Sequence, residues 1–196
     1  MNKKSENIET NESNIESINN NKNKCIFFKI KFDFFTHKYY LKDMGNGYGT
    51  YIKIDNTTIK NNSIVNIGDS LLIFSYEIYL NFKNDNQINN HKLLFLKIYN
   101  AEEEYHPIIL GADKELYTIG RAKDADITIN DITLSRINCF LYYTNDIWRI
   151  QDGNQNGEYS TNGTWIYAFE DTEIIDNMKF KSNKYNFICK FSTDFK

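Results

Sequence analysis

Apolar and polar residues alternate in short runs along most of this chain. The apolar positions are rich in Ile, Phe and Tyr, and Gly, Asn or Asp interrupts the runs. Aromatic and β-branched residues with a period of two, punctuated roughly every eight to twelve residues, favour antiparallel strands over helices. The runs that predict strands are residues 25–35, 39–43, 50–54, 64–67, 71–80, 93–99, 108–110, 116–120, 126–129, 137–143, 147–151 and 163–167, with further runs between 173 and 195. So many short strands predict an all-β sandwich.

Polar segments divide this pattern into parts. Residues 1–24 consist mainly of Asn, Ser, Glu, Lys and Ile, so they cannot bury enough apolar area to offset the entropy of ordering, and we predict disorder. A short helix is the alternative, which the Asn content disfavours. Residues 84–91 are polar and predict a linker. A β unit at 25–83 and a β domain at 92–196 are therefore expected.

Length and charge restrict the functional classes. The chain has 196 residues, of which 41% are hydrophobic, enough for one core and a small second one. The formal net charge of -3 lacks the basic excess that drives nucleic-acid binding by counterion release, so we expect no direct nucleic-acid partner. No apolar run has membrane-spanning length, and none near Met1 fits a signal peptide. An intracellular protein of the nucleus or cytoplasm is expected, with no membrane partner.

Cysteine and histidine positions give no sign of a metal, a cofactor or catalysis. The cysteines form no Cys-x-x-Cys pair, and burial as small apolar residues is the favoured interpretation for Cys25, Cys139 and Cys189. The histidines lack zinc-ligand spacing: His37, His91 and His106. No nucleophile, base and orienting residue form a recognisable set, so we expect neither an enzyme nor a bound cofactor.

Groups suited to phosphate binding stand at the ends of strand-like runs between residues 117 and 165. Gly120 precedes Arg121, Ser135 precedes Arg136, and a Ser-Thr-Asn-Gly-Thr turn spans 160–164. Taken alone, Gly120-Arg121 is typical of a turn glycine followed by a solvated arginine. Taken alone, Thr161-Asn162-Gly163 is typical of a hairpin turn. A β scaffold brings separated turns to one edge, so together they predict a binding surface.

In this order the motifs resemble a forkhead-associated (FHA) domain over residues 92–195. The resemblance rests on Ile119-Gly-Arg121, Asp126-Ile, Ser135-Arg136, Trp148 with Asp152, and Ser160-Thr-Asn-Gly-Thr164. It implies an antiparallel β-sandwich that binds phosphothreonine peptides through loops at one end. The implied roles are phosphate contact for Arg121, a hydroxyl donor in Ser135, added charge from Arg136, a pocket wall in Thr161 and a hydrogen bond to the ligand main chain from Asn162.

The sequence departs from the family pattern at Asn138, where the family has His in its Ser-Arg-x-His motif. The family's His braces the phosphate loops. Asn donates and accepts hydrogen bonds, so the same loops can be held by an amide. The turn after Asp152 also carries extra residues at 153–159.

Residues 21–83 resemble a degenerate partial copy of the same domain, covering only its later half. In this alignment Cys25 corresponds to Cys139, residues 39–43 correspond to 148–152, and residues 49–51 correspond to 163–165. Tyr48 replaces the turn Asn, and Asn21-Lys22 stand where Ser-Arg would be. We therefore expect this unit to bind no phosphate.

Two functional hypotheses follow. The first is a phosphothreonine-peptide-binding interaction module of a signalling or adaptor protein, with a phosphothreonine-containing protein as its partner. The second is a structural scaffold of tandem β-sandwiches whose partners bind without phosphate. The oligomeric state is left open.

Overall fold

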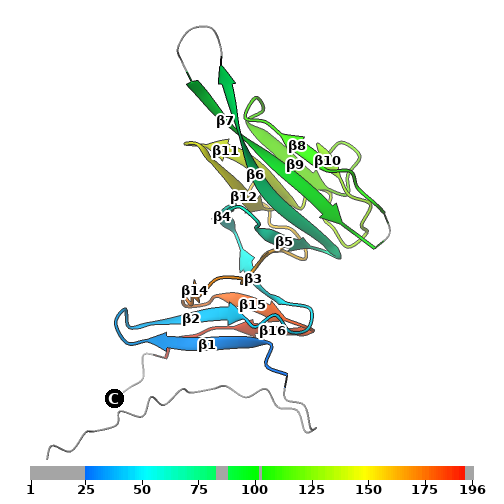
Figure 1. Ribbon diagram of the computed structural model, residues 1–196. Coiled ribbons are helices and arrows are strands. Elements are labelled where there is room, and N and C mark those ends of the chain that lie inside the picture. Colours follow the sequence, from blue (N-terminus) through cyan, green and yellow to red (C-terminus); the bar gives the residue numbers. More distant parts are fainter. Residues whose placement is uncertain (1–24, 83–87, 102, 193–196) are drawn as a thin grey trace, which may run out of the picture.

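The computed structural model describes residues 25–82, 88–101 and 103–192, and every regular element within them is a β-strand (Figure 1). The expected all-β class is confirmed. The strands are β1 (Phe28–Asp33), β2 (Lys38–Asp43), β3 (Thr50–Ile54), β4 (Asn56–Thr58), β5 (Ile64–Ile67), β6 (Ser70–Phe82), β7 (Ile88–Tyr99), β8 (Ile108–Leu110), β9 (Leu116–Gly120), β10 (Ile127–Thr128), β11 (Cys139–Thr144), β12 (Ile147–Asp152), β13 (Thr164–Tyr167), β14 (Thr172–Glu173), β15 (Lys179–Ser182) and β16 (Tyr185–Ile188).

The strands form three sheets, in which neighbours run antiparallel except for the short parallel pair β9 and β10. One sheet has the order β16-β15-β3-β13-β5-β6-β7-β8, a second β10-β9-β11-β12-β4, and a third β1-β2-β14. Alternation of buried and exposed residues within strands such as β3 and β12 gives each sheet one apolar face. Burying those faces requires the sheets to pack on one another.

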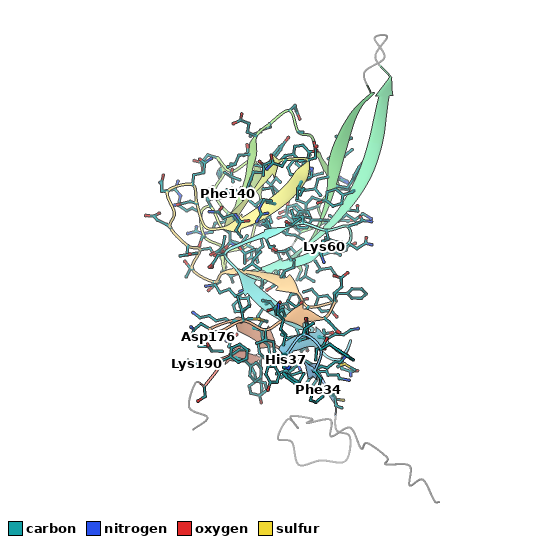
Figure 2. The ribbon with its side chains drawn as sticks, turned by 90° about the vertical axis from the view of Figure 1, so that its left-hand side faces the viewer. Phe34, His37, Lys60, Phe140, Asp176 and Lys190 are labelled. Carbon is teal, nitrogen blue, oxygen red and sulfur yellow. The ribbon has the colours of Figure 1, made fainter. Side chains whose placement is uncertain are left out.

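Two hydrophobic cores result, and they define two sandwiches. The larger sandwich packs β10-β9-β11-β12-β4 on β13-β5-β6-β7-β8, around a core that includes Trp148, Phe74 and Ile119. The smaller sandwich packs β1-β2-β14 on β3-β15-β16, around Leu41 and Phe180. Figure 1 shows the larger one above, mostly in green and yellow, and the smaller one below. Figure 2 shows Phe140 in the larger sandwich and Phe34, His37, Asp176 and Lys190 around the smaller one.

Each sandwich is assembled from both halves of the chain. In the larger one, β4 pairs with β12, and β5 pairs with β13. In the smaller one, β14 pairs with β2, and β15 pairs with β3. The two arrangements are copies of each other, related by the antiparallel pair β3 and β13. The later strands of each repeat therefore complete the sandwich begun by the other repeat.

This exchange corrects the expected division into separate units at 25–83 and 92–196. Strands β4–β6 come from the first segment but complete the sandwich that contains β7–β13. Residues 88–91 of the expected linker lie in β7, which pairs with β6 from Phe82↔Ile88 to Leu71↔Tyr99. Backbone pairing, rather than apolar composition, makes this stretch a strand. Residues 84–87 and the expected disordered segment 1–24 lie outside the described residues.

The strand registers also correct part of the repeat alignment. Asp43 pairs with Phe28, whereas Asp152 pairs with Cys139, so the counterpart of Cys139 is Phe28 and not Cys25. The equivalence of Asp43 with Asp152 agrees with the backbone bonds on either side. Met44 N donates to Phe27 O over 3.0 Å, as Gly153 N donates to Asn138 O over 2.8 Å.

Candidate functional site

Three turns meet at one end of the larger sandwich, and each carries residues singled out by the sequence. They are the β9–β10 turn, the β10–β11 loop and the β12–β13 loop. Arg121 N donates to Ser135 O over 3.2 Å, which joins the first two turns. Thr161 N donates to Ser135 Oγ over 2.9 Å, which joins the third. Arg121, Ser135 and Thr161 are therefore brought together as the sequence motifs predicted.

Arg121 is exposed and held from one side. Its Nε donates to the carbonyl of Leu134 over 2.8 Å, and within the described residues its terminal nitrogens have no hydrogen-bond partner. Gly120 makes this placement possible, because a Cβ there would lie 2.1 Å from Arg136 O. The Gly-Arg pair thus lets two turns approach closely and leaves a positioned guanidinium facing solvent.

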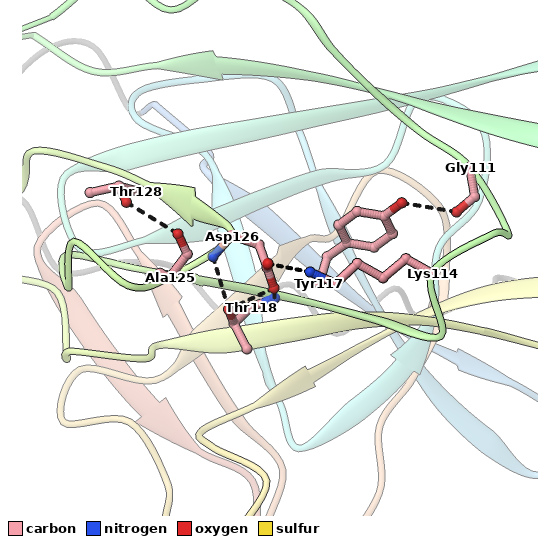
Figure 3. A network of polar contacts seen from close by, with 7 residues as sticks. All are labelled: Gly111, Lys114, Tyr117, Thr118, Ala125, Asp126 and Thr128. Atoms are coloured by element: carbon pink, nitrogen blue, oxygen red, sulfur yellow. Dashed lines mark hydrogen bonds and ion pairs between the residues drawn. The ribbon is translucent and has the colours of Figure 1, made fainter.

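The β9–β10 turn that carries Arg121 is braced by Asp126 (Figure 3). Asp126 Oδ2 accepts hydrogen bonds from Thr118 N at 2.8 Å and Thr118 Oγ1 at 2.9 Å, and Lys114 pairs with the other oxygen. Burial acts to raise the pKa of Asp126, but Lys114 and Thr118 outweigh it, so the pKa lies below its ordinary value. The turn also gains a bond from Thr128 Oγ1 to Ala122 O at 3.1 Å.

Two hydroxyl groups lie side by side next to this guanidinium-bearing turn. Ser135 Oγ donates to Thr161 Oγ1 over 3.3 Å while accepting from Thr161 N. Ser135 is half-buried and Thr161 is exposed. A hydroxyl donor, a second hydroxyl and an arginine at adjacent turns form a set that suits a phosphate group.

At this end of the sandwich, the Asn162 side chain connects two loops, whereas Arg136 is exposed to solvent. Asn162 Nδ2 donates to Thr133 O over 2.7 Å, and Asn162 O accepts from Trp165 Nε1 over 2.7 Å, so this residue ties the β10–β11 and β12–β13 loops together. Arg136 is exposed, and its carbonyl accepts from Ala122 N at 3.1 Å. Within the described residues no side chain pairs with the Arg136 guanidinium.

Asn138 is buried directly beneath the loops. Its Oδ1 accepts from Ser135 N and its Nδ2 donates to Thr164 Oγ1, both at 3.4 Å. Thr164 Oγ1 in turn donates to Asp152 Oδ1 over 2.7 Å, and Ser160 Oγ donates to the same oxygen over 2.6 Å. Asn138 thus connects the Ser135 loop to a buried carboxylate that also anchors the Ser160–Gly163 turn.

Sequence reasoning missed a second anchor of the Ser135 loop, the buried Asp131. Its Oδ2 accepts from Ser70 Oγ and Asp69 N, both at 2.9 Å, and its Oδ1 accepts from Thr133 N at 2.8 Å. Burial acts to raise the pKa of Asp131, but these hydrogen bonds outweigh it and hold the pKa below its ordinary value. Gly68 packs tightly here, since a Cβ on it would lie 2.3 Å from Thr133 Oγ1.

A lysine from the first repeat also approaches the site. Lys53 of β3 lies opposite Trp165 of β13. A Cβ placed on Gly163 would lie 2.8 Å from Lys53 Cε and 3.5 Å from its Nζ. Because β3 reaches β13 only through the exchange of strands, this positive charge beside the Thr161–Gly163 turn was not expected from the motifs.

The cysteines differ in burial, and all three are free. Cys139 is buried, as expected for a small apolar residue, and burial raises the pKa of its thiol. Cys189 is half-buried, whereas Cys25 is exposed, which contradicts the expected burial of Cys25. Within the described residues, His, Cys, Asp and Glu side chains form no group of three or more able to hold a metal ion.

Residues 117–182 match the family model described as the FHA domain. The resemblance to an FHA domain is confirmed. The matched segment contains Arg121, Ser135, Asn138, Thr161 and Asn162. It also runs through β14 and β15, whose places in the larger sandwich are taken by β4 and β5.

Domains of the FHA family are protein-interaction modules, and they are not enzymes. No curated protein and no solved structure matches the chain. In the part of the chain that the structure describes, no helix has the length and apolar character needed to cross a membrane.

Proposed function

We propose that the three turns of the FHA segment bind a phosphothreonine-containing segment of a partner protein, as the recognition module of a signalling or adaptor protein. The observation that carries the proposal is the contact of Thr161 N with Ser135 Oγ at 2.9 Å. It lies beside a turn where, within the described residues, the Arg121 side chain is held through Nε and its terminal nitrogens have no partner. The terminal guanidinium nitrogens and the hydroxyl groups are left to face a ligand together.

The chemistry of these groups matches a phosphorylated side chain. Phosphothreonine carries close to two negative charges and accepts several hydrogen bonds. Arg121 supplies a planar fork of donors, Ser135 a hydroxyl, and Arg136 and Lys53 further positive charge. Charge-assisted hydrogen bonds contribute about 1.5–3 kcal/mol each, so after the costs of association a few of them give roughly micromolar affinity. Such affinity suits a reversible reader.

The test is calorimetry of the whole chain with a phosphothreonine peptide library and the matching unphosphorylated peptides. The whole chain is needed because residues 92–196 lack β4–β6. Binding of phosphorylated peptides only, with a loss of about tenfold or more in Arg121→Ala, is expected. Lys123→Ala is the matched control, since Lys123 is exposed on the same turn. Equal binding of both peptide classes, or unchanged affinity in Arg121→Ala, would overturn the proposal.

A phosphate-independent scaffold is the second candidate function. It is favoured by Asn162, whose side-chain amide already donates to Thr133 O, and by Asn138, whose side chain makes two long hydrogen bonds of 3.4 Å. A pull-down from cell extract, with and without phosphatase treatment, separates the two candidates. Partners retained after phosphatase treatment support the scaffold, and partners lost support the phosphate reader.

A further inference from the structure

The smaller sandwich is an incomplete copy of the larger one. Strands β1, β2 and β14 correspond to β11, β12 and β4, and β3, β15 and β16 correspond to β13, β5 and β6. In the larger sandwich β11 has a further neighbour, β9, and β6 has a further neighbour, β7. Within the described residues no strand pairs with the corresponding edges of β1 and β16. Among the described residues, the edge of β1 is therefore open where its counterpart is covered.

Burial of matching residues shows the consequence. The counterparts of Phe28 and Ile30 in β1 are Cys139 and Leu141 in β11, and both counterparts are 0% exposed. Phe28 and Ile30 are only partly buried, although they pack against the second core. The same holds in the facing sheet, where Phe187 is only partly buried and its counterpart Leu72 is 0% exposed. Among the described residues, the smaller core is thus uncovered on the side where β9 and β7 cover the larger one.

The open edge also offers backbone groups. Phe27 O accepts from Met44 N at 3.0 Å, so it points toward β2. Carbonyl and amide of one peptide point in opposite directions, so the amide of Phe28, and by strand alternation those of Ile30 and Phe32, point away from β2. In β11 the equivalent edge is the one that pairs with β9. A row of such groups is a template for an added strand.

We propose that an extended segment of a partner protein adds as an antiparallel strand to the free edge of β1. The position of β9 on β11 defines the chemistry of this segment. Ile119 and Tyr117 of β9 stand opposite Cys139 and Leu141. The partner's residues opposite Phe28 and Ile30 are therefore apolar, separated by one outward-facing residue. Main-chain hydrogen bonds supply affinity in this mode, and the alternate side chains supply specificity.

Charge sets a further preference. Lys31 is exposed on the outer face of β1, at the position that corresponds to Tyr142 in β11. Tyr142 stands opposite Leu116, so a carboxylate at the partner's equivalent position lies across from Lys31. Opposite charges directly across from each other on neighbouring strands attract, which favours a carboxylate at that position. The chain's own residues 1–24 do not fit the pattern, because they contain no two apolar residues two positions apart.

The probe for this edge is a fluorescently labelled peptide with the sequence of residues 113–121, the segment that contains β9. Hydrogen exchange of the full chain is measured with and without saturating peptide. Slower exchange at Phe28, Ile30 and Phe32 is expected. The control peptide carries Tyr117→Ser and Ile119→Ser, and it is expected to leave those amides unprotected. Protection elsewhere only, or equal protection by the control peptide, would overturn the proposal.

A pair of variants tests the backbone contact itself. Ile30→Pro removes the outward amide without removing a bond to β2, whereas Ile30→Val keeps the amide and a similar side chain. Fluorescence anisotropy is expected to show a loss of about tenfold or more in peptide affinity for Ile30→Pro and little change for Ile30→Val. Circular dichroism checks folding, and if Ile30→Pro does not fold, the exchange measurement on the unaltered chain decides. If sedimentation shows that the chain alone forms a dimer through β1, a second copy of the chain occupies this edge instead of a partner protein. That result would overturn the proposal.

Discussion

Ile52 of β3 and Ile166 of β13 face each other in an antiparallel pair at the junction of the two sandwiches. Ile52 is buried in the smaller core, and Ile166 packs against both cores. The neighbouring residues pair in antiparallel register, with Trp165 opposite Lys53 and Tyr167 opposite Tyr51. The pair is thus the centre about which the two repeats exchange their later strands, and it makes the chain one structural unit.

The exchange predicts that residues 92–196 do not fold alone. Removing the first segment deletes buried side chains of the larger core: Ile59, Val65, Ile67, Leu72 and Phe74. At about 1.5–3 kcal/mol for each, the summed loss is comparable to a typical domain stability of roughly 5–15 kcal/mol. Circular dichroism during heating is expected to show no cooperative transition for 92–196 and a clear one for 25–196. A sharp melt of the shorter chain would contradict the exchange.

Gly120→Ala is expected to weaken both folding and phosphopeptide binding. The added Cβ would lie 2.1 Å from Arg136 O, so the β10–β11 loop must move away from Arg121. A shift of backbone in a packed loop costs about 1–3 kcal/mol. Chemical denaturation measures the stability, and calorimetry measures the binding. Gly157→Ala is the control for adding a methyl group, because a Cβ there meets no atom within 4 Å, although its positive φ adds local strain. Intact binding by Gly120→Ala would contradict the close approach.

Asn138→Ala is expected to reduce phosphopeptide affinity while leaving Arg121 in place. The substitution leaves Ser135 N and Thr164 without their amide partner in a buried position. Leaving buried polar groups unpaired costs about 1–3 kcal/mol of stability. We expect part of this cost to appear as less ordered binding loops, which lowers the affinity. Thermal unfolding and calorimetry separate the two effects. Asn130→Ala, at an exposed position of the same loop, serves as the comparison and is expected to behave like the unaltered chain.

Asp131 predicts how stability depends on pH. Because hydrogen bonds lower the pKa of Asp131 in the folded state below its ordinary value, the carboxylate takes up its proton at a higher pH in the unfolded chain than in the folded one. Its contribution to stability is therefore fully present above about pH 5 and is lost as the pH falls through the folded pKa. Asp131→Asn is expected to lower the free energy of unfolding at neutral pH and to make it depend less on pH in the acid range, as measured by denaturation at several pH values. Asp124→Asn, at an exposed site, is the control and is expected to leave the pH dependence of the stability unchanged.

The local pattern of the sequence was sufficient for much of the site. Alternation in 116–120, 147–151 and 163–167 predicted strands that the structure contains, and the intervening Gly, Ser, Thr and Asn residues predicted turns at one end. Arg121, Ser135 and Thr161 meet there. The brace from Asp131 to Ser70 and Asp69 escaped prediction because it joins segments about sixty residues apart, without a local motif.

By itself, the sequence determined which residues form strands, which faces are apolar and which turns carry the candidate phosphate-binding groups, because these depend on neighbours within a few positions. Only the tertiary structure decided the partners of those strands. Both repeats contain equivalent later strands, so β4 and β14, or β5 and β15, satisfy the same local pattern. The choice rests on long-range pairing around Ile52 and Ile166, where backbone hydrogen bonds and shared cores unite distant segments.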